Sequence, residues 1–345
     1  SINNFNMISF KNDYSEGALP AILQALAATN DIQQGGYGED DYSQQAIDLI
    51  KRKINNPHAA IYLVSGGTQA NLTFISSVLR PYESVIAATT GHIFHHETGA
   101  IEATGHKIET VIAKDGKLTP ALVASFIDKV EAVHMPLPRL VYISNSTELG
   151  THYLRAELIA LWEYCKRKGL LLYLDGARLA SGMMAGDISY QDLGKYTDAF
   201  YIGGTKNGAL IGEAIVINNP SLQEYFAYNL KMRGALLAKG RLLGIQFMEL
   251  FKDDTYLSIG AYMNEMARRL SDGIRKAGYD FLIESKTNQI FPILPVRVIH
   301  TLQEKYAFYV WQPIDEERAA VRLVTSWSTQ AAAVEAFLGD LRACK

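Results

Sequence analysis

Residues 170–178 read LLLYLDGAR, an apolar run that ends in Asp175, Gly176, Ala177 and Arg178. Five apolar residues followed by a glycine-containing turn predict a buried strand with a polar carboxyl end. Because a desolvated carboxylate without a partner is costly, Asp175 needs a partner that offsets its charge. The protonated ring nitrogen of a cofactor is one such partner. The other possible partner is Arg178, with which Asp175 would form an ion pair that caps a helix.

The segments around this strand alternate short apolar runs with stretches of helical period. Helices are expected between the strands, at residues 69–79, 119–133 and 156–168. The expected strands are residues 59–64, 84–88, 107–112, 139–144, 170–174 and 198–202. This alternation predicts an α/β fold with a mostly parallel, buried sheet. Such sheets bind ligands beyond the carboxyl ends of their strands, where Asp175 lies.

The pattern changes after Gly208, and a chain of 345 residues leaves room for about two domains. We expect a large α/β domain over residues 1–252 and a small α+β domain over residues 253–345. The first would end with a strand at 210–217 and a helical stretch at 221–251. The second would hold a helix at 257–277, strands at 279–283, 290–296 and 320–325, and a helix at 330–342.

The composition excludes several classes of protein. The formal net charge is -3, and charged residues make up 20% of the chain, which argues against binding nucleic acid through bulk positive charge. No apolar run approaches the ~20 residues that cross a bilayer, and the first residues lack a signal-peptide pattern. Two cysteines cannot form a disulfide framework, and no spacing predicts a metal site. We therefore expect a cytoplasmic protein with no nucleic-acid, membrane or metal partner.

Two further motifs follow predicted strands. Lys206 lies in the loop GGTKNG after residues 198–202, where a lysine amine can form a Schiff base with a carbonyl group, although most lysines are merely solvated. Residues 65–71 read SGGTQAN and lead from a strand into a helix. A helix start of this kind binds a phosphate through its free N–H groups, whereas a plain glycine turn with Thr68 as N-cap is the alternative.

The order of the three motifs resembles the threonine aldolase and β-eliminating lyase family. These are pyridoxal-phosphate enzymes with the aspartate aminotransferase fold (fold type I), in which a large domain with a mostly parallel sheet precedes a small C-terminal domain. Residues 37–41 (YGEDD) and 321–325 (VRLVT) match the family as well. The resemblance runs from Phe10 to the last helix, and it implies a pyridoxal 5'-phosphate cofactor.

The resemblance implies a role for each matching residue on the cofactor side. Lys206 corresponds to the lysine that forms the Schiff base, and Asp175 to the residue that holds the pyridine nitrogen. Arg178 would lie at the ring oxygen and His92 would stack on the ring. The phosphate group would be bound by Gly67, Thr68 and Thr205.

On the substrate side, Arg322 resembles the arginine that binds the substrate carboxylate, although a structural ion pair is an alternative. Asn12 and Asp13 occupy the positions of a Ser-Asp pair that lines the site. Tyr37 and Arg241 match residues that family dimers contribute across the subunit interface, which implies a homodimer or homotetramer with shared active sites; core packing is the alternative for Tyr37. His95 and His96 flank the site and are equally compatible with a simple helix start.

One departure from the family bears directly on the reaction. Glu148, in the segment NSTELG, replaces a histidine thought to contact the substrate hydroxyl. The resemblance implies retro-aldol cleavage of a small amino acid, threonine or allo-threonine, to glycine and acetaldehyde. His92, a water or Glu148 would take the hydroxyl proton. Two alternatives remain open: β-elimination from a related amino acid, and a non-catalytic protein that binds the same cofactor.

Overall fold

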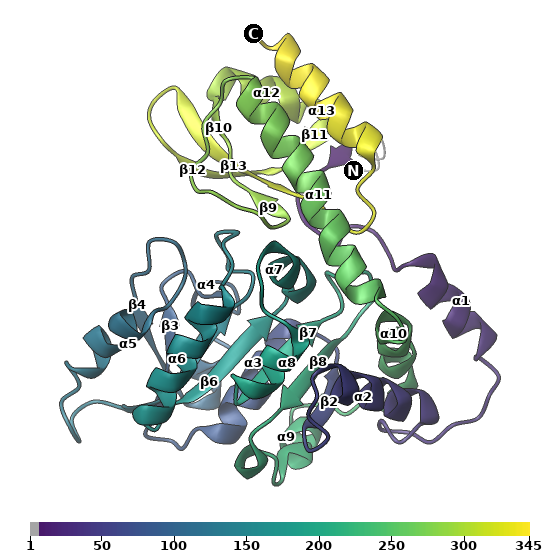
Figure 1. Cartoon of the computed structure of the whole chain (residues 1–345), viewed down its shortest axis with the longest axis vertical. Coiled ribbons are helices and arrows are strands. Elements are labelled where there is room, and N and C mark those ends of the chain that lie inside the picture. Colours follow the sequence, from purple (N-terminus) through teal and green to yellow (C-terminus); the bar gives the residue numbers. More distant parts are fainter. Residues whose placement is uncertain (1–6) are drawn as a thin grey trace.

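A computed structural model describes residues 7–345 and shows a seven-stranded sheet at the centre of the large unit (Figure 1). Strand β8 runs antiparallel to both of its neighbours, and the other strands are parallel to one another. From one edge to the other, the strands are β2 (Ala60–Val64), β8 (Glu213–Ile217), β7 (Ala199–Gly203), β6 (Leu171–Gly176), β5 (Leu137–Ser144), β3 (Glu83–Ala88) and β4 (Lys107–Val111). The predicted α/β class with a mostly parallel sheet is confirmed.

Successive residues of the central strands point to opposite faces of this sheet, as the pleat requires. In β5, Val141 and Ile143 join one apolar core, whereas Leu140 and Tyr142 join another. The second core is closed by α3 (Gly67–Val78) and α9 (Phe226–Met232). The first is closed by α2 (Asp41–Lys53), α5 (Pro120–Ile127), α6 (Arg155–Arg167), α7 (Leu179–Ala185), α8 (Tyr190–Lys195) and α10 (Arg241–Phe251), with α1 (Pro20–Ala28) beside α10.

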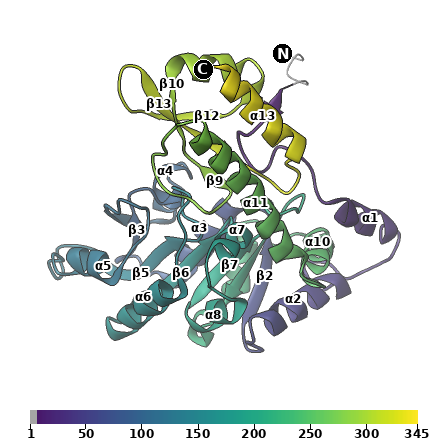
Figure 2. The ribbon, with the colours of Figure 1, turned by 45° about the horizontal axis from the view of Figure 1, so that its top comes forward.

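The second unit is built on a small antiparallel sheet. Strand β13 (Arg318–Val324) pairs with β12 (Tyr309–Pro313), β10 (Ile293–Pro295) and β9 (Gln289–Ile290). The long helix α11 (Thr255–Lys276) packs on α7 of the large unit and on α13 (Ala331–Ala343) of the small one, so it joins the two units (Figures 1 and 2). Helix α12 (Val296–Gln303) is the remaining helix of this second unit.

The N-terminal strand does not pack with the domain to which it was assigned, residues 1–252. Strand β1 (Ile8–Ser9) pairs with β11 (Tyr306–Ala307), and Phe10 joins the core of the second unit. A chain segment from the start of the sequence therefore packs against the C-terminal unit before it reaches the large one. The division of the remaining chain near residue 252 stays our proposal.

Two local expectations were wrong, and two elements were missed. Residues 221–251 form three pieces rather than one helical stretch: the 3-10 turn Pro220–Leu222, α9 and α10, because the chain turns at Gly234 with a φ of 69°. Residues 279–283 make only one isolated bridge, Phe281 to Pro292, since Gly278 turns the chain and proline has no N–H to donate. Helix α12 and strand β12 were not expected from the sequence.

The parallel strands place the sequence motifs at one edge of the sheet. Strand β2 ends at Val64 and α3 begins three residues later at Gly67. Strand β6 carries Asp175 at its carboxyl end, and β7 ends three residues before Lys206. Because parallel strands end at the same edge, these motifs converge. Two short elements, α4 (His92–His95) and the 3-10 turn Glu102–Thr104, follow β3.

Candidate active site

A cavity of about 440 Å³ lies where the motifs converge. Eight of the residues expected in the site line it: Gly67, Thr68, His92, Glu148, Asp175, Arg178, Thr205 and Lys206. Arg322, Asn12, Tyr37 and Arg241 are not among the lining residues. Within residues 7–345, no group of three or more His, Cys, Asp and Glu side chains is arranged to hold a metal ion. None of the helices in that range is both long and apolar enough to cross a membrane.

The start of α3 forms one end of the cavity. No side chain caps this helix, so the N–H groups of its first turn remain available to an anion. A side chain at Gly67 would place its Cβ 2.8 Å from the hydroxyl of Tyr201, so the backbone approaches this end of the cavity as only glycine permits. Thr68 adds a hydroxyl to the same turn.

Asp175 lies buried in the wall of the cavity and is held by neutral donors. The hydroxyl of Tyr142 donates to Oδ2 at 2.6 Å, and the side-chain amide of Asn71 donates to the same oxygen at 3.0 Å. The backbone N–H of Ala177 donates to Oδ1 at 3.0 Å. The Asp175–Arg178 ion pair that the sequence allowed is not formed. The carboxylate of Asp175 is therefore fixed in position, and its negative charge remains available to a cation in the cavity.

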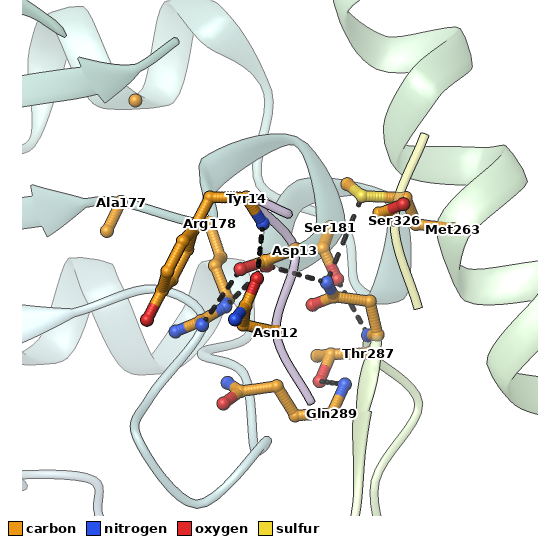
Figure 3. Close-up of polar contacts among 12 residues, drawn as sticks. Asn12, Asp13, Tyr14, Ala177, Arg178, Ser181, Met263, Thr287, Gln289 and Ser326 are labelled. Carbon is orange, nitrogen blue, oxygen red and sulfur yellow. Dashed lines mark hydrogen bonds and ion pairs between the residues drawn. The ribbon is translucent and has the colours of Figure 1, made fainter. Parts of the chain in front are cut away.

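Arg178 pairs instead with Asp13, which arrives from the N-terminal segment (Figure 3). Its Nε donates to Oδ2 at 2.7 Å and its Nη2 to Oδ1 at 3.1 Å, while Asn288 donates to Oδ2 at 3.0 Å. Burial works to raise the pKa of Asp13, but the charge and hydrogen bonds of Arg178 outweigh it and the pKa is lowered. The pair thus ties residues 12–14 to the start of α7.

The amine of Lys206 faces this same region. Burial lowers its pKa, and the nearby charge of Arg178 lowers it further. In the part of the chain that the structure describes, Nζ of Lys206 forms no ion pair within 4.0 Å; it lies 5.7 Å from the centroid of the Tyr14 ring. Both effects favour the neutral amine, which is the nucleophilic form.

His92 is oriented by a carboxylate that the sequence did not single out. Its Nδ1 lies 2.9 Å from Oε1 of Glu97, whose side chain is completely buried. Asn71 donates to the same oxygen at 2.8 Å and so links Glu97 to Asp175. A carboxylate can only accept, so Nδ1 carries the hydrogen of this contact, and in the neutral tautomer Nε2 is then the acceptor. The signal for Glu97 was weak: a charged residue five positions after His92, in the bend that follows the short helix α4.

Glu148 is hydrogen-bonded to the backbone of His92. Its Oε1 accepts the backbone N–H of His92 at 3.0 Å and the hydroxyl of Ser144 at 2.8 Å. Burial raises the pKa of Glu148; the Ser144 bond opposes the shift and the charge of Asp175 adds to it. Glu148 is therefore a carboxyl group that holds its proton to higher pH than usual.

Four residues expected in the site do not line the cavity, and each has other partners. Arg322 on β13 donates to Gln289 at 3.5 Å and to the carbonyl of Lys11 at 3.3 Å, and its buried Nε has no partner among residues 7–345. Asn12 accepts the N–H of Tyr14 and the hydroxyl of Ser15. Arg241 donates to the carbonyls of Thr29 and Ile32. Tyr37 is half exposed beneath Lys231, at a separate cavity of about 320 Å³.

The comparisons with known proteins agree on one family. The model of the β-eliminating lyase family matches residues 12–326. The low specificity L-threonine aldolase of Pseudomonas sp. (strain NCIMB 10558) is 32% identical, over 97% of each chain. A solved structure of Leishmania major threonine aldolase is 44% identical and superimposes with a TM-score of 0.97, covering 98% of this chain and 99% of its own. An aspartate aminotransferase of Thermus thermophilus, at 13% identity, shares the fold with a TM-score of 0.71 over 99% of this chain and 92% of its own.

Proposed function

The chain belongs to the β-eliminating lyase family, and we propose that it uses pyridoxal 5'-phosphate to cleave threonine or allo-threonine to glycine and acetaldehyde. The observation that carries this proposal is the convergence of Lys206, Asp175 and the uncapped start of α3 on one cavity. These are a nucleophilic amine, a fixed carboxylate and an anion site, arranged around a space of about 440 Å³.

The residues present fit the cofactor. The first turn of α3 with Gly67 and Thr68 would hold the phosphate, and Asp175 would pair with the ring nitrogen. Asp175 suits this role because its three hydrogen bonds come from neutral groups, so a protonated nitrogen would complete its charge balance. When bound, pyridoxal phosphate supplies an electron-accepting ring conjugated to the substrate nitrogen, which makes the Cα–Cβ bond breakable.

Lys206 would bind the cofactor aldehyde and yield this place to the amino group of the substrate. Its lowered pKa favours the neutral form that both exchanges need. Arg322 would bind the substrate carboxylate, since among residues 7–345 its guanidinium makes only two long hydrogen bonds and its Nε has no partner. A bidentate pair at this point would fix rotation about Cα.

His92 would remove the proton from the β-hydroxyl group. Glu97 holds Nδ1, which directs the acceptor Nε2 away from Glu97 and stabilises the ring after it gains the proton. The Cα–Cβ electron pair then remains with Cα as acetaldehyde leaves, and a proton returned to Cα completes glycine. We propose His92 rather than Glu148 for this step, because Oε1 of Glu148 is already occupied by two hydrogen bonds, whereas the contact of Nδ1 with Glu97 leaves Nε2 of His92 as an acceptor.

The second candidate reaction, β-elimination to pyruvate and ammonia, is favoured by the same property of Glu148. A carboxyl group that keeps its proton can protonate a leaving hydroxyl as water departs. In retro-aldol cleavage no such acid is required. The two reactions therefore differ most in the role of Glu148, which would act as an acid only in the elimination.

We also propose a homo-oligomer in which Tyr37 and Arg241 approach a neighbouring site. The half-exposed Tyr37 and its position away from the cavity of its own chain support this. A cytoplasmic location remains a proposal.

Product analysis tests the function. The purified, cofactor-loaded protein would be given L-threonine, L-allo-threonine, D-threonine, phenylserine and serine in parallel. Glycine with the matching aldehyde is the expected outcome. A 2-oxo acid with ammonia (pyruvate from serine, 2-oxobutyrate from threonine) would support elimination instead, and no product from any substrate would support the non-catalytic alternative.

A further inference from the structure

Glu213, the first residue of β8, lies between the two loops that would contact the cofactor phosphate. Because β8 is antiparallel, its first residue meets the last residues of its neighbours: Val64 of β2 on one side and Gly203 of β7 on the other. The uncapped turn before α3 follows Val64, and the loop with Thr205 and Lys206 follows Gly203. Glu213 lines the same cavity as both loops.

The carboxylate of Glu213 is buried and bonded to neutral donors. The N–H groups of Gly204 and Thr205 donate to Oε2 at 2.7 and 3.3 Å. The hydroxyl of Thr205 donates to Oε1 at 2.9 Å, and the N–H of Gly212 donates to that hydroxyl at 3.1 Å. No ion pair within 4.0 Å accompanies Glu213 in residues 7–345. Thr205, expected to bind the phosphate, thus has its only hydroxyl proton committed to a carboxylate.

We propose that Glu213 takes up one proton when the phosphate of the cofactor enters the cavity, and that this proton switches Thr205 into a phosphate donor. The proposal rests on the proposed cofactor. The proton adds to Oε1 of Glu213 and comes from the solvent, and no bond between heavy atoms changes. A protonated Oε1 donates to the Thr205 hydroxyl oxygen, which still accepts from Gly212 and now directs its own proton elsewhere. Every group keeps a partner in both states.

Electrostatics favour the uptake in this direction. A phosphate monoester carries a charge of about −1.5 to −2 at pH 7, and a like charge nearby disfavours a carboxylate. Burial already raises the pKa of Glu213 to about 7, against the lowering effect of the Gly204 and Thr205 bonds. A second negative charge would raise this pKa further.

The other titratable groups around Glu213 do not take up the proton in its place. Lys206 from the loop after β7 lowers the pKa of Glu213, but its amine would be consumed in binding the aldehyde. Tyr201 of β7 and Tyr256 of α11 have raised pKa values through burial and stay neutral. Helix α3 carries no titratable residue, and β2 carries only Tyr62, whose pKa burial also raises. On α10, Arg241 bonds to backbone carbonyls and Glu249 pairs with Lys252.

Calorimetry of the cofactor-free full chain tests the proposal. Pyridoxal phosphate and pyridoxal, which lacks the phosphate, would be titrated at pH 8 in two buffers of different ionisation heat, which yields the protons taken up. Wild type should take up close to one proton more than Glu213→Gln with pyridoxal phosphate, and this excess should be clearly smaller with pyridoxal, which consumes the Lys206 amine but brings no phosphate charge. Above about pH 7, the Kd of wild type for pyridoxal phosphate should rise more steeply than that of the variant, by up to tenfold per pH unit.

Equal proton uptake by wild type and Glu213→Gln, or a difference that is equally large with pyridoxal, would overturn the proposal. Infrared difference spectra of wild type alone keep the test valid if the variant fails to fold. A protonated-carboxyl band should appear on adding pyridoxal phosphate and should be stronger than with pyridoxal; no band, or bands of equal strength, is contrary evidence. If neither ligand binds, it is the proposed cofactor that fails rather than the role of Glu213.

Discussion

The guanidinium of Arg178 forms a two-bonded pair with the carboxylate of Asp13, which precedes it by 165 residues (Figure 3). This pair fixes the N-terminal segment, whose strand β1 pairs with β11 of the C-terminal unit, against the helix that follows Asp175. It also sets a positive charge beside Lys206, which contributes to the lowered pKa of that amine. One ion pair thus serves both the assembly of the two units and the chemistry of the cavity.

Asp13→Asn should destabilise the chain by about 3–5 kcal/mol, because it leaves the buried guanidinium of Arg178 without its counter-charge. Urea unfolding at pH 7 measures the change. Glu265→Gln is the matched control, since it breaks an exposed pair with Arg268 and should cost less than about 1 kcal/mol. Equal costs for the two variants would contradict the structural role of the Asp13–Arg178 pair.

The stabilising effect of Asp13 should also depend on pH in a defined direction. Its folded-state pKa lies below the ordinary value of 3.8, so the unfolded chain binds more protons at acidic pH. The contribution is therefore complete above pH 3.8 and is lost as the pH falls through the lower folded value. The stability difference between wild type and Asp13→Asn should shrink in that acidic range.

Lys206→Met should stabilise the cofactor-free protein at neutral pH. The folded-state pKa of Lys206 is lowered from 10.5, so the unfolded wild-type chain binds the extra proton and wild-type stability rises with pH toward that value. The advantage of the variant, about 1.4 kcal/mol for each unit of pKa change, should disappear as the pH approaches 10.5. The exposed Lys239→Met is the control. An advantage of Lys206→Met that does not vary with pH would contradict the lowered pKa.

Glu97→Gln should lower kcat/KM by about 10²–10⁴, because it removes the carboxylate that orients the His92 ring and stabilises it after it gains the proton. A double-mutant cycle separates this from a general structural effect. In a His92→Asn background, Glu97→Gln should have little further effect. Additive losses would show that Glu97 acts independently of His92.

Asp175→Asn should retain cofactor binding through Lys206 and the phosphate end of the cavity but lose about 10–1,000-fold in kcat. This range corresponds to the 1–3 pKa units by which a contacting carboxylate favours a protonated ring nitrogen. Tyr142→Phe, which removes one of the three hydrogen bonds to Asp175, should lose far less. An unchanged rate in Asp175→Asn would exclude the ring-nitrogen role.

The sequence predicted those parts of the site that adjoin strand ends. Asp175, Lys206 and Thr68 follow apolar runs, and parallel strands necessarily bring such ends together. The partners of these residues were not predictable in the same way. Glu97 reaches His92 on one short turn, and Asn71 connects Glu97 to Asp175 only because α3 packs beside β6. Glu213 begins an antiparallel strand, so a rule about carboxyl ends does not find it.

Local signals also explain where the fold prediction failed. Residues 221–251 carry a helical pattern throughout, but Gly234 turns the chain and divides the stretch between the two faces of the sheet. Arg178 was expected to act beside the ring or as a partner of Asp175, and its pairing with Asp13 depends on a contact between segments far apart in the sequence. Distant pairing of this kind leaves no periodic trace.

The central claim is that Lys206 is the cofactor-binding amine, and reductive trapping tests it most directly. The full chain would be incubated with pyridoxal phosphate, reduced with borohydride, digested and analysed by mass spectrometry. About one adduct per chain on Lys206 is expected, with none at that position in Lys206→Ala and an unchanged adduct in Lys239→Ala. No adduct in wild type, or an equal total yield in Lys206→Ala, would contradict the account.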